Sequence, residues 1–321
     1  MSETAGSKRQ GTPSSRLLPS LQDNYKSRSL WRLALSRFLS HRMAVLGSLL
    51  LVAVVAFVIV GAFFVKEAAG NKPDILNRYS PPTAAHPFGT DQVGRSILIR
   101  AIYGGQISLA IGILAVAISI TLGSLVGLIS GYMGAWVDSL LSRMTEALLS
   151  IPPLILLLVL SSALARNSSN ITILGREMSS TVVIVVVLIG LKSWMQLSRI
   201  VRAQVYSLKE REFVLAARSI GAGHRHILLR SILPNLIEPI IVTATLGVGT
   251  AILTEAYLSF LGFGIQPPTA TWGNMITEFE GQVDRIWWIW VFPGAFIVIT
   301  VLAINFIGDG LRDALDPRSI K

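Results

Sequence analysis

The stretch EFVLAARSIGAGHRHILLRSILP, residues 212–234, is a polar and basic segment that lies between two long apolar runs. The runs extend from about Thr181 to Ser198 and from Leu236 to Phe260, and a helix needs about 20 apolar residues to cross a bilayer. Gly221 is suited to the end of one helix, and Pro234 is suited to the start of the next. The pattern therefore predicts short helices at the water-facing end of a membrane bundle, where they would form a docking surface for a partner.

Six apolar segments in total are long enough to cross a membrane, which predicts an all-α integral membrane protein with six transmembrane helices. Besides the two runs above, they lie near Ala44–Val65, Ile107–Ser130, Leu148–Ala165 and Trp288–Ile307. The third span in chain order contains Pro152 and Pro153 near its beginning. We interpret this pair as the start of a helix, since proline is tolerated in the first turn, with a functional kink as the alternative.

The composition agrees with a membrane protein. Of the 321 residues, 52% are hydrophobic and 14% are charged, and the mean hydropathy is +0.61, whereas a soluble domain carries about 25% charged residues. The net charge is +10. Because the basic residues gather beside apolar spans, we attribute this charge to membrane topology and to contact with anionic lipid, and expect no nucleic acid as a partner.

Several classes of catalytic and metal site are missing from the sequence. The chain has no cysteine, no HExxH motif and no Gly-Lys dipeptide, so it lacks thiolate sites and a phosphate-binding P-loop. The chain has four histidines, His41, His86, His224 and His226, and they show no triad-like arrangement with a nucleophile. We expect His224 and His226 to be solvated. We therefore expect a chain that is not an enzyme and that binds no metal or cofactor itself.

Lysine and arginine are distributed unevenly between the loops. The first 42 residues contain eight, residues 199–230 contain seven and residues 264–287 contain one. Under the positive-inside rule, the N-terminus and the loop at 199–234 lie in the cytoplasm, and six spans return the C-terminus to the same side.

The chain before the first span is expected to contain two kinds of structure. Roughly the first 25 residues are rich in serine, arginine and glutamine, and they are predicted to be disordered rather than to form a cleavable signal peptide. Leu30–Leu39 can form a basic amphipathic helix in the membrane interface, with Trp31, Leu35 and Phe38 on its apolar side. A flexible basic tail is the alternative.

Small residues recur every four positions in two predicted spans, which places them on one helix face and allows close helix packing in lipid. The second span has Ala115, Ser119, Gly123, Gly127 and Gly131, and the fifth has Thr243, Gly247, Ala251, Glu255 and Ser259. An acid costs about 2.5–3.5 kcal/mol at the bilayer centre, so we expect Glu255 to point into the bundle. It would form an ion pair with Arg95 or Arg100, or line a substrate path.

Two loops on the external side have strong turn signals. The first contains Gly89, Thr90, Asp91 and Gly94, and the second contains Pro267, Pro268 and Trp272. The first pattern predicts a tight turn in which Asp91 caps a helix. The second predicts a rigid elbow at the membrane interface with Trp272 as its aromatic anchor.

The polar segment resembles a known loop at this point. Ala216-Ala217-x-x-x-Gly221, with Leu233-Pro234 twelve and thirteen residues after the glycine, is similar to the EAA loop of permease subunits of ABC importers. Leu215 stands where that family often has Glu, and Ser231 stands where it often has Ile. The resemblance implies that Glu212, one turn earlier, supplies the acid. The resemblance implies that a coupling helix docks on a cytoplasmic ATPase through Glu212, Ala216, Ala217, Gly221, Leu233 and Pro234.

Further segments narrow the resemblance. HPFGTDQVGRS at residues 86–96 is similar to the HPxGTDxxGRD segment of the C-type permease of oligopeptide and dipeptide importers, with Ser96 in place of Asp. EALLSIPPLILLLVL at 146–160, LSFLGFGIQPPTATWGNM at 258–275 and FPGAFIVITVLAINFIGDGLRDALDP at 292–317 are similar as well. The resemblance implies that the external loop with Gly89, Thr90, Asp91, Gly94 and Arg95 contacts a binding protein or a sister permease. A purely structural role is the alternative.

The resemblance implies a type I ABC importer permease fold in a bacterial cytoplasmic membrane. Residues 1–42 would form a cytoplasmic tail and residues 43–321 the transmembrane permease domain, with the coupling loop at 199–234. The implied partners are a B-type permease, two ATPase subunits that bind ATP and Mg, an extracytoplasmic substrate-binding protein and membrane lipid. The expected cargo is di- or oligopeptides. Nickel or another small solute is an alternative, as are an ion-coupled secondary transporter and a membrane-anchored scaffold.

Overall fold

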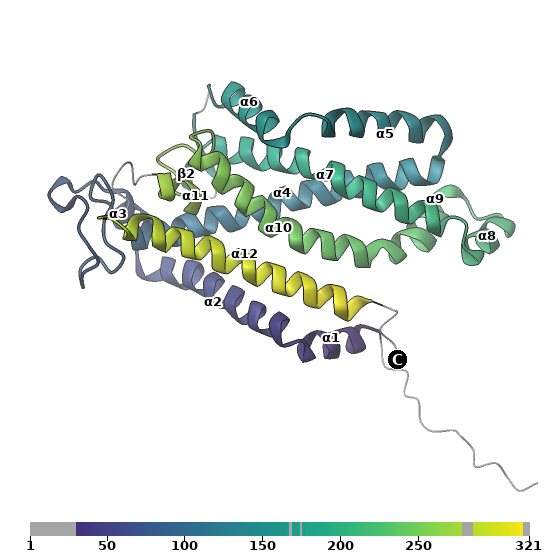
Figure 1. Cartoon of the computed structure of the whole chain (residues 1–321), viewed down its shortest axis with the longest axis horizontal. Coiled ribbons are helices and arrows are strands. Elements are labelled where there is room, and N and C mark those ends of the chain that lie inside the picture. Colours follow the sequence, from purple (N-terminus) through teal and green to yellow (C-terminus); the bar gives the residue numbers. More distant parts are fainter. Residues whose placement is uncertain (1–29, 167–168, 174, 278–284, 317–321) are drawn as a thin grey trace, which may run out of the picture.

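A computed structural model describes residues 30–166, 169–173, 175–277 and 285–316. It shows an elongated bundle of helices that run along a common long axis (Figure 1). The main helices are α2 (Arg42–Phe64), α4 (Ile97–Met133), α5 (Ala135–Leu149), α7 (Thr181–Leu208), α10 (Ile237–Phe260) and α12 (Trp288–Leu315). The shorter ones are α1 (Leu30–Ser40), α3 (Glu67–Asn71), α6 (Pro153–Ala165), α8 (Glu212–Ser219), α9 (His224–His226) and α11 (Trp272–Ile276). A small antiparallel hairpin pairs β1 (Asn170–Ile173) with β2 (Arg176–Ser179).

Among the described residues, five helical segments are long and apolar enough to cross a membrane. They are α2, α4, α7, α12 and the continuous segment His224–Phe260, which includes α10. These segments confirm five of the six predicted spans. The second span is longer than predicted, since α4 begins at Ile97 rather than near Ile107.

The predicted third span has a different form in the structure. Residues Leu148–Ala165 do not form one helix, because α5 ends at Leu149 and α6 begins at Pro153 after a bend of 82°. Pro153 occupies the first turn of α6 and Pro152 precedes it, which agrees with the helix-start interpretation. With 13 residues, α6 is too short to cross a bilayer alone. The bent α5–α6 pair instead leads from the C-terminal end of α4 to the other end of the bundle, where α7 begins (Figure 1), so the chain passes along the bundle six times.

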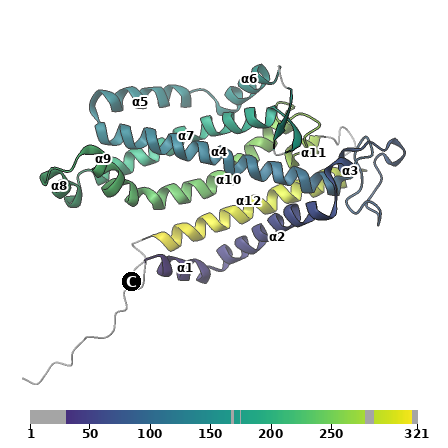
Figure 2. The ribbon, with the colours of Figure 1, turned by 180° about the vertical axis from the view of Figure 1, so that it is seen from behind.

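Close packing between α4 and α7 confirms the predicted ridge of small residues. A Cβ atom on Gly127 would lie 2.7 Å from the carbonyl oxygen of Ser198, and one on Gly131 would lie 2.7 Å from Cβ of Val205. The helices α2 and α12 lie side by side in both views (Figures 1 and 2). There, Gly47 allows the same close approach to Ala303. Glycine therefore sets the distance between helices in both pairs.

The N-terminal helix α1 lies against the end of α12. The ring of Phe38 packs beside Gly310, and Nη1 of Arg37 donates a hydrogen bond to the carbonyl oxygen of Asp316 at 3.4 Å. The side chain of Phe38 is therefore used for packing within the chain, and the position of α1 in the membrane interface stays a prediction. Leu35 and Leu39 are exposed. The predicted disorder of the first 25 residues and the side chain of Trp31 lie outside the described residues.

Candidate functional site

Helix α8 is held against the bundle by one apolar side. Val214 is fully buried in a cluster with Val205, Ile227 and Ile232, and Ala217 packs against the same cluster. Val214 and Ala217 are three residues apart, which places them on one helix face. This contact fixes α8 at one end of the bundle, beside α9 and the end of α7 (Figure 1).

An adjacent side of α8 presents apolar side chains to solvent. Phe213, Ala216 and Ile220 recur at helical spacing, and all three are exposed, Ile220 by 85%. We call these three residues the α8 apolar face. A cluster of exposed apolar groups at a water-facing end is typical of a surface that contacts a partner. The paired alanines of the sequence thus separate in space, since Ala216 faces solvent and Ala217 faces the bundle.

Two residues are candidates for the position at which the EAA loop often carries a glutamate. Leu215 and Glu212 both lie at the surface of α8. No ion pair within the described part of the chain involves Glu212. Each side chain is placed where a partner could contact it, and the assignment of the acidic role to Glu212 stays a prediction.

Gly221 ends α8 in the way that the sequence predicts. Its backbone is left-handed, with φ at +81°. Its N–H donates to the carbonyl of Arg218, and the N–H of Ala222 donates to the carbonyl of Ala217, as in a glycine-terminated helix. A Cβ atom here would meet no atom within 4 Å. The requirement for glycine is therefore conformational and leaves the surrounding surface open.

One long helical segment joins the α8 region to a membrane span. After α9, the chain makes a π turn at Ile227–Ile232 and a 3-10 turn at Leu233–Leu236 before α10 begins. Pro234 has no N–H to donate to the preceding turn, which accounts for the irregular hydrogen bonding. Leu233 packs against the cluster that holds Val214. Helix α8 is therefore attached to the segment that includes α10 both through the turn at residues 221–223 and through this shared apolar cluster.

Two polar contacts connect this region to the α4–α5 corner. The hydroxyl of Tyr132 and Nδ1 of His224 are 2.9 Å apart. Arg202 and Asp138 form two parallel hydrogen bonds, at 2.5 and 2.6 Å. His224 is exposed, as expected, but it also has this partner in α4. Sequence reasoning missed both contacts because the partners are 64 and 92 residues apart in the chain.

At the other end of the bundle, Asp91 organises the external loop. Its carboxylate accepts hydrogen bonds from the N–H groups of Val93 and Arg95. It also forms ion pairs with the side chains of Arg95 and Arg100, each at 2.6 Å. The next helix begins after Ser96, which gives no side-chain cap. The prediction that Asp91 caps a helix is therefore wrong, because its oxygens close the loop instead.

The environment of Asp91 favours the charged carboxylate. The residue is only 1% exposed, and this burial alone would raise its pKa. The charges of Arg100 and Arg95, together with the two backbone N–H groups, outweigh burial and hold the pKa of Asp91 below its ordinary value. The loop is therefore held by a buried charge network.

The predicted tight turn is confirmed around this network. Gly89 and Gly94 have positive φ values of +75° and +81°. A Cβ atom on Gly94 would collide with the carbonyl of Asp74. Thr90 is buried, and its carbonyl accepts a hydrogen bond from Nε1 of Trp288 at 3.2 Å. The loop is thereby attached to the start of α12.

Glu255 lies inside the bundle, but its partners differ from those predicted. The residue is 1% exposed, and Oε1 accepts hydrogen bonds from the hydroxyls of Ser259 at 2.7 Å and Thr271 at 2.8 Å. The predicted ion pair is wrong, because Arg95 and Arg100 are engaged by Asp91. The side chain of Glu255 is thus bound by two hydroxyl groups, one from α10 itself and one from the loop after it, rather than by a cation.

Trp272 also has a different environment from the one expected. It is fully buried, its Nε1 donates to the carbonyl of Ala101 at 2.9 Å, and its ring stacks on Phe296 at 5.5 Å. The prediction of an anchor at the membrane interface is wrong. The segment after Pro268 folds inward and places the indole between α4 and α12.

The comparison with known families agrees with this geometry. Residues 123–321 match the model of the family described as binding-protein-dependent transport system inner membrane component. This chain belongs to that family. Residues 29–82 also match the N-terminal transmembrane domain of oligopeptide transport permease C. Together the two matches confirm the resemblance to a C-type permease, and the first of them includes the polar loop.

Several relatives extend over nearly the whole chain. The chain is 44% identical over 286 residues to a putative peptide permease protein of Brucella suis biovar 1, covering 88% of this chain and 90% of the relative. It is 37% identical over 302 residues to the dipeptide transport system permease protein DppC of Alkalihalophilus pseudofirmus, with 94% of each covered. It is 37% identical over 293 residues to the oligopeptide transport system permease protein OppC of Bacillus subtilis, with 91% of each covered.

Proposed function

We propose that this protein is the permease subunit of an ATP-binding-cassette importer that carries di- or oligopeptides across the bacterial cytoplasmic membrane. The observation that carries the proposal is the α8 apolar face, which is exposed one turn before the helical segment His224–Phe260 that includes α10. The names of the relatives support peptides as the cargo. This chain would supply part of the path and would not catalyse a reaction.

The proposed complex contains a B-type permease, two ATPase subunits and an extracytoplasmic substrate-binding protein. ATP and Mg would bind to the ATPases, and this chain would bind no cofactor. Closure of the ATPases would displace α8, and the long segment with α10 would transmit the motion into the membrane. Such rigid-body movements can switch a cavity between outward and inward access.

The proposed orientation places both termini in the cytoplasm. Helices α1 and α8 and the C-terminal end of α12 lie at the same end of the bundle (Figure 1). The basic residues of 199–230 belong to this end. Leu35 and Leu39 of α1 are exposed there, beside Arg32, and would contact anionic lipid.

The variant Ala216→Arg tests the docking role of α8. Because Ala216 is exposed, the protein should fold and insert normally, while a bulky charge on the α8 apolar face should prevent ATPase docking. We expect peptide uptake and binding-protein-stimulated ATP hydrolysis in proteoliposomes to fall to background. Ser207→Arg, at an exposed position in the last turn of α7, is the matched control and should retain both. Undiminished uptake by Ala216→Arg would contradict the proposal.

Purification in mild detergent separates the alternatives. An ATPase should copurify in stoichiometric amount with an importer permease, and not with an ion-coupled transporter or a scaffold. The solute retained by the cognate binding protein distinguishes peptides from nickel or another small solute.

A further inference from the structure

Helix α7 carries polar side chains at a depth where most neighbours are apolar. Lys192, Gln196 and Arg199 are spaced by four and three residues, so they lie on one face of the helix. We call them the α7 polar stripe. Lys192 is half-buried and lies near the middle of this 28-residue helix, and Gln196 and Arg199 are exposed.

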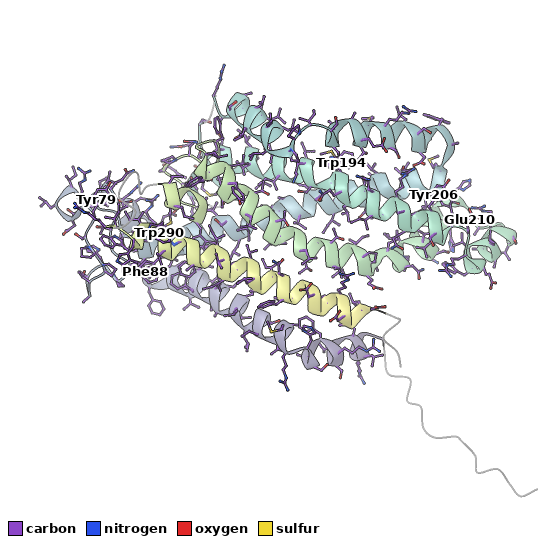
Figure 3. All side chains as sticks on the ribbon, viewed as in Figure 1. Tyr79, Phe88, Trp194, Tyr206, Glu210 and Trp290 are labelled. Carbon is purple, nitrogen blue, oxygen red and sulfur yellow. The ribbon has the colours of Figure 1, made fainter. Side chains whose placement is uncertain are left out.

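Lys192 and Gln196 face away from α4, and Arg199 lines a recess that α4 and α5 also border. The contact with α4 runs through Gly190, which packs on Ile118, and through Leu197, which packs on Gly123. Lys192 follows Gly190 by two residues and therefore lies on a different side of the helix. Figure 3 shows that Trp194 of α7 lies in the middle part of the bundle, and that Tyr206 and Glu210 lie toward the end that carries α8.

Within the described part of the chain, no hydrogen bond or ion pair engages the three residues of the stripe. Two acids lie near its inner end. Asp138 is bound by Arg202, and Glu146 of α5 lines the same small recess as Arg199 without an ion pair to it. Lys192 therefore remains an uncompensated cation at mid-membrane depth.

The stripe cannot be a lipid-facing surface. A charged side chain is unfavourable in hydrocarbon unless it meets water or a polar partner. The other exposed side of α7, nearer its outer end, carries Val183, Val187 and Leu191 and is suited to an apolar environment. The two sides therefore face different media, and the stripe borders water or another protein.

We infer that the α7 polar stripe lines the inner half of the substrate path and binds the carboxylate groups of solutes in transit. The inference rests on the proposed function. An ammonium, an amide and a guanidinium all donate hydrogen bonds to a carboxylate. Successive groups are about 6 and 4.5 Å apart along the axis at 1.5 Å per residue. A carboxylate can therefore pass from one donor to the next, which favours release over tight retention.

Cysteine accessibility tests this inference directly, because the chain has no cysteine of its own. The Gln196→Cys variant is assembled in the complete importer, and inside-out membrane vesicles are prepared from it. The vesicles are treated with one of two methanethiosulfonate reagents, of which the sulfonatoethyl derivative is anionic and the trimethylammonioethyl derivative is cationic. We expect the anionic reagent to react on the order of tenfold faster, since two cations flank the thiol. Adding Lys192→Met should reduce this ratio, and adding Lys192→Arg should preserve it. Val187→Cys, on the apolar side, is the control and should react with neither reagent.

Each other outcome contradicts the inference. Equal rates for the two reagents would show an aqueous surface without selectivity for anions. No reaction at Gln196→Cys, at rest or during ATP hydrolysis, would show that the stripe is sealed against another protein chain. These rates are measured on this chain and do not depend on which solute is carried. The inference can therefore fail while the proposed function stands.

Uptake by the reconstituted importer gives a second readout. Lys192→Met should lower the uptake of a peptide with a free C-terminal carboxylate several-fold more than that of the same peptide with an amidated C-terminus. Lys192→Arg should restore the wild-type ratio, and Leu191→Met is the control beside it. The same substrate-binding protein is used with every variant. Its own preference between the free and the amidated peptide therefore does not affect the comparison of uptake ratios between variants. Equal losses for both peptides would overturn the inference in favour of a structural role.

Discussion

At the scale of single residues, Asp91 shows how one buried charge can hold a loop of a membrane protein together. Its side chain collects two arginines and two backbone N–H groups in a place that excludes water. The sequence predicts the turn because glycines mark it. The sequence does not predict the network, because Arg100 belongs to α4. That helix begins at Ile97, ten residues before the predicted start of the second span.

Replacing Asp91 by Asn should destabilise the outer end of the protein. The change would remove the carboxylate charge that pairs with Arg100, a residue that is 3% exposed. Breaking a buried ion pair costs about 3–5 kcal/mol. We expect a lower midpoint of thermal unfolding for the solubilised protein, with Asp74→Asn, an exposed acid in the same loop, as the control. Equal midpoints for the two variants would show that the network contributes little to stability.

The same residue predicts a dependence of stability on pH. Its folded pKa lies below its ordinary value of 3.8 because of Arg100, Arg95 and the backbone N–H groups. The stabilisation is therefore fully present above this ordinary value and is lost as the pH falls through the folded pKa. The difference in unfolding midpoint between wild type and Asp91→Asn should be constant from neutral pH to about pH 5 and should shrink below about pH 4. A difference that changes between pH 7 and pH 5 would assign the effect to another group.

At the scale of helices, the periodic small residues predict correctly which helix face is packed, whereas the helix boundaries are not predicted correctly. The four-residue repeat of glycine in α4 correctly identified the face that packs on α7. The start of α4 was missed because Arg100 and Gln106 interrupt the apolar run. The side chain of Gln106 donates to the carbonyl of Val58, and such a partner cannot be read from the sequence. The α5–α6 bend lies at Pro152 and Pro153, where the sequence predicts a helix start with a kink only as the alternative, because proline is compatible with both.

Gly127→Val tests the α4–α7 contact. The new side chain would meet the backbone oxygen of Ser198 and the side chain of Val201, so α7 would have to move. Overpacking typically costs about 1–3 kcal/mol, and we expect reduced thermal stability and reduced yield of assembled complex. Gly294→Ala in α12 is the control, because a Cβ atom there meets nothing within 4 Å. Similar losses for both variants would indicate general sensitivity to helix glycines.

At the scale of the whole molecule, the long axis of the bundle is the direction in which the chain crosses the membrane. Hydropathy predicts the number of passages, and lysine and arginine counts predict their direction. The sequence does not show which helix faces meet the sister permease. Exposed apolar residues on a span have the same appearance whether lipid or protein covers them. Only charged or strongly polar positions, such as Lys192, separate the two cases.

The orientation of the whole molecule can be tested with two single cysteines. Leu76 is 97% exposed, and Glu210 is exposed just after the end of α7. Figure 3 shows Tyr79, which follows Leu76 by three residues, and Glu210 at opposite ends of the bundle. Leu76→Cys should react with a membrane-impermeant maleimide in intact spheroplasts, and Glu210→Cys should react only after permeabilisation. The unsubstituted chain has no cysteine and provides the background. The reverse pattern would place the α8 apolar face outside the cell, where no ATPase could reach it.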